Sequence, residues 1–146
     1  MATLHVYCDG SGEERVGRPG GWAFVVVRDE AEVLHGEGAV ASTTSLIMEL
    51  EAALAGLRAV LARRWHERHE VVLISDSSIA LDIAAGRFTP KPPQYAELSA
   101  ALRKAATRAK ASTKWVRAHG GHRWNEEVDA RARAARLGLR IVERRR

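Results

Sequence analysis

The chain lacks the features that mark secreted and membrane proteins. Cys8 is its only cysteine, so no disulfide can form within the chain, and a reducing compartment is favoured. No apolar run approaches the roughly 18 residues that span a bilayer, and the N-terminus has no basic segment followed by a long apolar one. We therefore expect a cytoplasmic location and no membrane partner.

What is present is typical of a globular protein. The 146 residues are 46% hydrophobic and 28% charged, which suits a single domain over residues 1–146. We expect its core over about residues 3–138, a basic tail at 139–146, and a monomer as the default state.

Charge is distributed unevenly along the chain. Residues 1–99 carry 9 Lys/Arg and 14 Asp/Glu, whereas residues 100–146 carry 14 and 4. A basic second half favours a polyanionic partner, because cationic side chains displace counterions from phosphates. Solvated helix faces explain the same basic runs equally well.

The apolar pattern predicts an α/β fold. Residues 3–8, 20–29 and 31–40 read as an antiparallel three-stranded meander. Apolar residues then recur at helical spacing from Ile47 to about Trp65, with Thr44 or Ser45 available as N-cap. The later elements are expected to be a strand (70–76), a short helix ending at Gly86, a proline-rich loop (87–94), a helix (95–111), a short strand (113–118), and a helix that Asn125 caps and Gly138 ends. Helical crossovers would place the last two strands parallel to the first, giving a five-stranded mixed sheet flanked by helices.

Acidic residues lie at the ends or in the first turns of these predicted elements. Asp9 ends the first strand and Asp76 ends the fourth, so parallel strands would bring both acids to one edge of the sheet. Glu49 lies in the first turns of the helix that follows the meander, and Ala53 and Gly56 give that helix a small-residue flank suited to close approach.

Each acid also has an ordinary explanation. Asp9 could be a turn residue, Glu49 could favour the helix N-terminus, Asp76 could cap the short helix, and Asp129 could be solvated. Packed together, however, these carboxylates would repel one another unless a cation compensates. Oxygen ligands favour Mg²⁺ or Mn²⁺ over zinc, and two such ions beside a basic surface indicate phosphoryl transfer on nucleic acid.

Four motifs resemble type 1 ribonuclease H in order and surroundings, over residues 4 to about 137. They are "YCDGSG", "MELEAALAGL", "ISDSS" and "WVRAHGGHRWNEEVDARA". The last is the most specific, since it keeps the family's spacing at His119, Gly121, His122, Asn125, Glu126 and Asp129. The chain is most similar to bacterial and archaeal forms that lack a basic protrusion.

The resemblance implies a ribonuclease H-like fold and endonucleolytic hydrolysis of the RNA strand of RNA–DNA hybrids, leaving 5′-phosphate and 3′-hydroxyl ends. Asp9, Glu49, Asp76 and Asp129 match the carboxylates that hold two Mg²⁺ ions, for which Mn²⁺ can substitute. His119 matches a loop histidine that assists proton transfer or product departure, and its ordinary pKa near 6.5 suits that role.

The resemblance also implies substrate contacts. Gly10, Ser11 and Gly12 would read the ribose, and Thr44 matches a threonine that contacts a phosphate of the DNA strand. Phe88 would offer an aromatic surface to a deoxyribose, although a buried loop anchor is an equally good interpretation.

The chain departs from the family pattern beside the helix N-terminus and in the proline-rich loop. Ser45, Leu46 and Ile47 replace residues that are often polar in the family, and the segment from 88 to 95 is too short for a basic handle. The basic residues within 103–117 would partly substitute for that handle.

Other functions stay open on the sequence alone. They are a hybrid-binding module without turnover, a ribonuclease H domain related to reverse transcriptases, and another nuclease of the same fold. The exonucleases usually carry Asp-x-Glu in the first strand, where this chain has Asp9-Gly10-Ser11.

Overall fold

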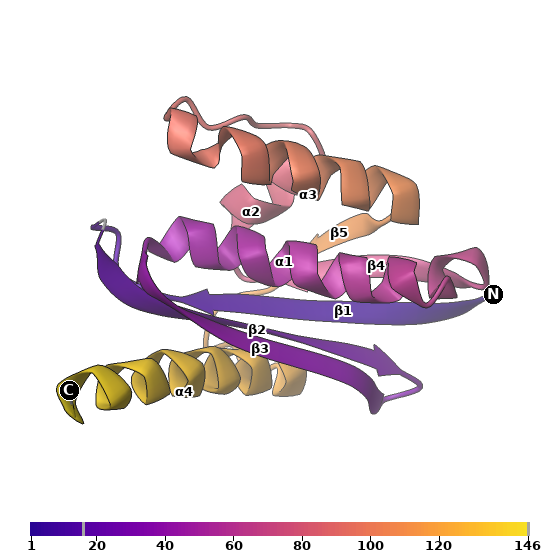
Figure 1. The fold of residues 1–146 in the computed structure, drawn as a ribbon. Helices are drawn as coiled ribbons and strands as arrows, with labels where there is room; N and C mark the ends of the chain where they lie inside the picture. The colour runs from indigo at the N-terminus through magenta and orange to yellow at the C-terminus, as the bar shows by residue number, and fades with distance from the viewer. Residues whose placement is uncertain (16, 146) are drawn as a thin grey trace.

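The computed structural model describes residues 1–15 and 17–145, which form a mixed β-sheet with helices on both faces (Figure 1). The strands are β1 (Ala2–Ser11), β2 (Arg18–Arg28), β3 (Ala31–Thr43), β4 (His69–Ser75) and β5 (Ser112–Trp115). The α-helices are α1 (Ser45–Ala62), α2 (Ser78–Ala84), α3 (Ala96–Ala109) and α4 (Arg123–Arg145), with short 3₁₀ turns η1 (Trp65–Glu67) and η2 (Pro93–Tyr95).

The sheet has the strand order β3-β2-β1-β4-β5. β1, β2 and β3 pair antiparallel, whereas β4 lies parallel to both β1 and β5. This topology confirms the predicted five-stranded mixed sheet. Among the residues that the structure describes, no helix has the length and hydropathy needed to cross a membrane.

Helices α1, α2 and α3 cover one face of the sheet, and α4 covers the other (Figure 1). The larger core lies on the α1 side, where Leu4, Val6 and Leu50 are fully buried. Gly56 allows α1 to approach β1, because a Cβ at this position would lie 2.7 Å from Cγ1 of Val6. The predicted small-residue flank of this helix is therefore confirmed.

β1 extends beyond its parallel neighbour β4, and this difference in length creates an opening. The β1–β4 pairing ends at Tyr7↔Ile74, whereas the β1–β2 pairing continues to Ser11↔Gly21. Asp9 therefore lies inside β1, paired with Ala23 on one side only, rather than at the end of the strand as predicted.

Both predicted ends of the last helix are wrong. α4 begins at Arg123, and the N–H of Glu126 donates to the carbonyl of His122 at 3.0 Å, so Asn125 lies in the first turn and is not the N-cap. Gly138 does not end the helix, because it does not adopt the left-handed conformation that terminates helices at glycine. The helix continues to Arg145, and Arg146 of the predicted basic tail lies outside the described residues.

Candidate active site

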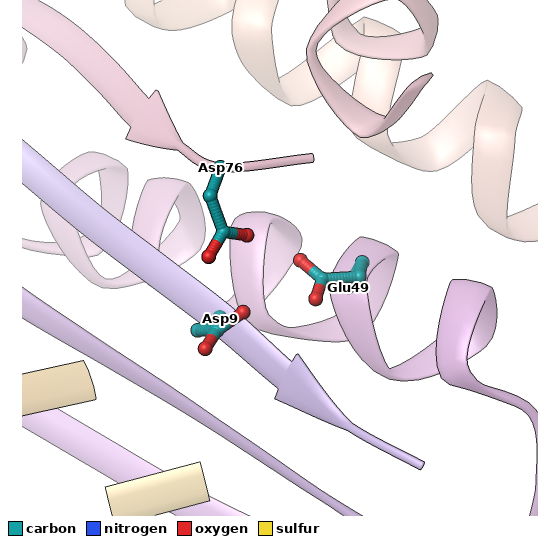
Figure 2. Close-up of side chains that lie close together, drawn as sticks. All are labelled: Asp9, Glu49 and Asp76. Atoms are coloured by element: carbon teal, nitrogen blue, oxygen red, sulfur yellow. The ribbon is translucent and has the colours of Figure 1, made fainter. Parts of the chain in front are cut away.

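Three of the four predicted carboxylates meet at the opening beside β4. Asp9 comes from β1, Glu49 from the second turn of α1, and Asp76 from the segment after β4 (Figure 2). One carboxylate oxygen from each of them lies within 4.8 Å of the other two. Three elements far apart in sequence thus bring their acids to one place, as predicted.

The main chain at Gly10 joins two of these acids. Its N–H donates to Oδ1 of Asp9 at 3.0 Å and to Oε1 of Glu49 at 3.1 Å. A Cβ at Gly10 would overlap the backbone of Met48 and Glu49, so the glycine is required for this close approach of β1 and α1. The N–H of Gly10 is therefore already used within the site and is not free to bind a ribose.

Burial makes the charged form of this cluster unfavourable. Asp9 is only 3% exposed, and burial, reinforced by the charge of Glu49, raises the pKa of Asp9 to about 11. Burial also raises the pKa of Glu49 to about 7, although hydrogen bonds from Asp9 and the N–H of Gly10 oppose this shift. Without a cation, burial and mutual repulsion therefore favour a protonated pair over a fully ionised one.

Asp76 is directed into the site and is not a helix cap. Ser77 caps α2 instead, since its hydroxyl oxygen accepts a hydrogen bond from the N–H of Ala80 at 3.2 Å. Burial raises the pKa of Asp76, and a hydrogen bond from the side chain of Asn125 opposes that shift. Asn125 is 2% exposed, so the residue that the sequence suggested as an N-cap instead supports an acid of the site.

Asp129 lies beside the cluster but outside the group of three. Its carboxylate forms an ion pair with Arg133, one turn later on α4. A hydrogen bond with Asp129 is nevertheless among the smaller causes that raise the pKa of Asp9, which places the fourth acid at the edge of the site. Arg133, at i+4 on the same helix, therefore competes with the cluster for this carboxylate.

His119 lies in the loop between β5 and α4. The residue is exposed and has a left-handed backbone with φ of 55°, next to Gly121, which has φ of 84°. The positive charge that His119 can carry acts to lower the pKa of Asp76. The structure thus places this histidine near the acidic cluster and leaves it accessible.

The predicted substrate residues occupy two places. Gly10, Ser11 and Gly12 form the end of β1 and its exit, and a Cβ at Gly12 would lie 3.1 Å from the N atom of Ser45. Thr44 is 2% exposed, and its hydroxyl oxygen accepts the N-cap hydrogen bond from Ile47 at 3.2 Å, which confirms the predicted cap. Phe88, on the loop after α2, is 47% exposed and so is not a buried loop anchor.

A groove of about 360 Å³ opens beside Glu49. Its lining includes Ser45 and Leu46, two of the residues that depart from the family pattern, and also Ile79, which is 50% exposed. Glu14, Thr44 and Ser77 also line the groove, so the approach to the acids on this side mixes polar and apolar side chains.

The basic residues within 103–117 do not form one patch. Arg103 donates to Oγ1 of Thr89 at 2.9 Å and so holds the proline-rich loop. Arg108 and Lys110 line a cavity with Met1, at the opposite end of β1 from the acids. Within this stretch, Arg117 follows the end of β5 on the side of the site, so it has the better position to contact a substrate there.

The donor atoms of the cluster suit a hard divalent cation. Each side chain offers carboxylate oxygen, and Oε2 of Glu49 is buried without a hydrogen-bond partner among the described residues. A cation would satisfy that oxygen and offset the repulsion that raises the pKa of Asp9. The cluster is thus compatible with the predicted use of a divalent metal.

The fold and the acidic site together define a class of proteins, those with the ribonuclease H fold. The N-terminal RNase H domain of a Mycobacterium tuberculosis protein, solved as a fusion with maltose-binding protein, superposes with a TM-score of 0.84 at 19% identity. The match covers 98% of this chain and 99% of that chain. LC11-RNase H1, solved in complex with an RNA/DNA hybrid, gives a TM-score of 0.72 at 18% identity over 91% of this chain and 99% of its own.

Sequence comparison then shows the family. The RNase H family model matches residues 1–136, and a ribonuclease H of Chelativorans sp. is 36% identical over 92% of this chain and 85% of its own length. The chain belongs to the ribonuclease H family. The predicted resemblance and the predicted class of enzyme are thereby confirmed, and the family and fold support ribonuclease activity on RNA–DNA hybrids.

Proposed function

We propose that the chain is an endoribonuclease that hydrolyses the RNA strand of RNA–DNA hybrids with two divalent cations, leaving 5′-phosphate and 3′-hydroxyl ends. The observation that carries this proposal is the approach of Asp9, Glu49 and Asp76 to within 4.8 Å on a ribonuclease H fold. The hybrid bound to LC11-RNase H1 supports the choice of substrate.

Mg²⁺ would be the metal, and Mn²⁺ would substitute for it. By resemblance to the family, Asp9 would help to hold both ions, Glu49 and Asp76 would bind one, and Asp129 would help to hold the second. Cations bound there would make water acidic enough to attack at neutral pH and would offset charge on the leaving oxygen.

The remaining residues would bind substrate and move protons. His119 would deliver a proton to the 3′-oxygen that leaves the phosphorus, because it is exposed and its charge acts on Asp76. Ser11 and Gly12 would contact the ribose at the exit of β1. Thr44 would contact a DNA-strand phosphate through its hydroxyl hydrogen, since the hydroxyl oxygen already serves as the cap acceptor.

Phe88 would offer its exposed ring to a deoxyribose. Selectivity for the hybrid would come from contacts to 2′-hydroxyls on one strand only.

A cleavage assay on three duplexes tests the proposal. The purified chain is incubated with Mg²⁺ and with end-labelled hybrid, duplex RNA and duplex DNA of the same sequence. Cleavage of the hybrid alone, with ends that carry a 5′-phosphate, is expected. Tight binding of the hybrid without product at any concentration of Mg²⁺ or Mn²⁺ would instead identify a binding module.

A further inference from the structure

Trp115 makes a contact with the candidate metal site that its sequence position does not reveal. It is the last residue of β5 and lies opposite Ser75, the last residue of β4. Its indole N–H donates to the main-chain carbonyl of Asp76 at 3.0 Å. The side chain is nevertheless 54% exposed, so burial of its ring is incomplete.

Among the residues that the structure describes, the sheet provides no main-chain donor for the carbonyl of Asp76. The last main-chain bond of this pair of strands runs from the N–H of Val116 to the carbonyl of Ser75 at 3.1 Å. One residue later, the N–H of Ser77 donates to Oγ of Ser75 at 3.0 Å, which turns the chain toward α2. The indole of Trp115 therefore supplies the donor at the point where the sheet no longer does.

This hydrogen bond has a direct consequence for the carboxylate. The hydrogen bond anchors the carbonyl carbon that is bonded to the Cα atom of Asp76, and because the substituents of Cα are tetrahedral, it also restrains the Cβ atom from which the carboxylate extends. Asn125 acts on the same carboxylate and opposes the rise of its pKa. Trp115 thus restrains the backbone of Asp76, next to the side chain that enters the site.

We propose that Trp115 is a positioning residue, whose indole N–H orients Asp76 toward Asp9 and Glu49 and so increases the affinity of the cluster for divalent cations. This inference rests on the proposed function, in which Asp76 is a metal ligand. Partners that orient the ligands of a metal commonly change its affinity by about 10- to 100-fold, and one neutral hydrogen bond alone corresponds to about 2- to 10-fold.

Two substitutions separate the donor from the ring. Trp115→Phe keeps an aromatic surface and removes the N–H, whereas Trp115→Ala removes both. Trp65→Phe is the matched control, because Trp65 lies in η1, just before the opposite end of β4. Binding of Mn²⁺ alone is measured by calorimetry on the full chain, and thermal unfolding confirms that each variant is folded.

We expect Trp115→Phe and Trp115→Ala to weaken Mn²⁺ binding by a similar factor, about 3- to 10-fold, and Trp65→Phe to leave it unchanged. Hybrid cleavage by Trp115→Phe should return toward the wild-type kcat at saturating Mn²⁺, with KM for the hybrid unchanged. Wild-type Mn²⁺ affinity in Trp115→Phe would overturn the proposal. A loss confined to Trp115→Ala would also overturn it, because the ring and not the donor would then be responsible.

A second measurement needs no substitution that might unfold the chain. The indole N–H of Trp115 gives its own signal in an ¹⁵N-correlated NMR spectrum, and a Mg²⁺ titration of the wild-type chain should shift it together with the main-chain signal of Asp76. A stationary indole signal during saturation by Mg²⁺ would contradict the positioning role. Wild-type protein that binds Mn²⁺ but cleaves no hybrid would refute the proposed function alone, because the affinity comparison would still stand.

Discussion

The main-chain N–H of Gly10 donates to the carboxylate of Glu49 at 3.1 Å and thereby joins β1 to α1 at the centre of the acidic cluster. The bond can form because Gly10 has no side chain to separate the two elements. The same contact that supports the fold therefore also sets the position of a candidate metal ligand.

Gly10→Ala should destabilise the protein. A Cβ at this position would overlap the backbone of Met48 and Glu49, and overpacking of this kind costs about 1–3 kcal/mol in the free energy of unfolding. Gly138→Ala is the control, because its Cβ would meet nothing within 4 Å, and alanine in a helix interior is favoured by up to about 1 kcal/mol. Urea unfolding followed by circular dichroism measures both, and wild-type stability of Gly10→Ala would contradict the described contact.

The stability of the metal-free protein should depend on pH through Glu49 and Asp9. Because burial raises the folded-state pKa of Glu49 to about 7 and that of Asp9 to about 11, from ordinary values of about 4, the folded state binds both protons more tightly than the unfolded state. The stabilisation from Glu49 is complete below about pH 4 and is lost as the pH rises through about 7, whereas that from Asp9 declines over the same range and on toward about pH 11. Thermal unfolding in chelator should therefore show a falling Tm between about pH 5 and about pH 8.

Two variants isolate this effect from other titrating groups. Glu49→Gln should make the decline less steep and leave the part that buried Asp9 contributes, whereas Glu51→Gln, on the same helix two residues later, should keep the wild-type profile. Added Mg²⁺ should raise the Tm more at the higher pH, because a bound cation favours the ionised carboxylates. Identical pH profiles for wild type and Glu49→Gln would show that the buried carboxylate does not titrate as described.

The same pair of variants tests the site in catalysis. Glu49→Gln should lower the rate of hybrid cleavage by at least about 100-fold, because it removes a candidate metal ligand. Loss of a residue that only supports a ligand already costs up to about 100-fold. Glu51→Gln should cleave at the wild-type rate. Comparable losses in both variants would point to the stability of α1 and not to metal binding.

Arg133 should compete with metal for Asp129. The ion pair between them is partly exposed, and such pairs are worth up to about 1 kcal/mol, or about fivefold in an equilibrium constant. Arg133→Ala should therefore lower the Mg²⁺ concentration for half-maximal cleavage by up to about fivefold. Arg131→Ala, on the same helix, removes ion pairs with Glu32 of β3 and Glu127 of α4 and should leave this midpoint unchanged.

The order of the elements was predictable because the apolar periods are strong and local. The alternation of apolar residues in the meander and their helical spacing from Ile47 each define a face that must be buried. In the structure, these faces pack into the core. The convergence of Asp9, Glu49 and Asp76 followed from the parallel crossover between β1 and β4.

What the sequence could not predict depends on contacts between distant segments or on small local differences in energy. The hydrogen bond from Trp115 to Asp76 joins residues 39 positions apart, and no motif in the sequence indicates it. Gly138 carries a modest helix penalty of about 1 kcal/mol that the surrounding helix overcomes. Asn125 is a good N-cap by type, but the helix begins earlier because the carbonyl of His122 accepts the first-turn hydrogen bond.

The most direct test of the central claim is a strand-resolved cleavage assay with wild type and Asp9→Asn. The RNA and DNA strands of one hybrid carry different end labels, and each protein is incubated with Mg²⁺ or with chelator. We expect cleavage of the RNA strand alone, by wild type alone and with Mg²⁺ alone. Cleavage of the DNA strand, or an undiminished rate in folded Asp9→Asn, would contradict it.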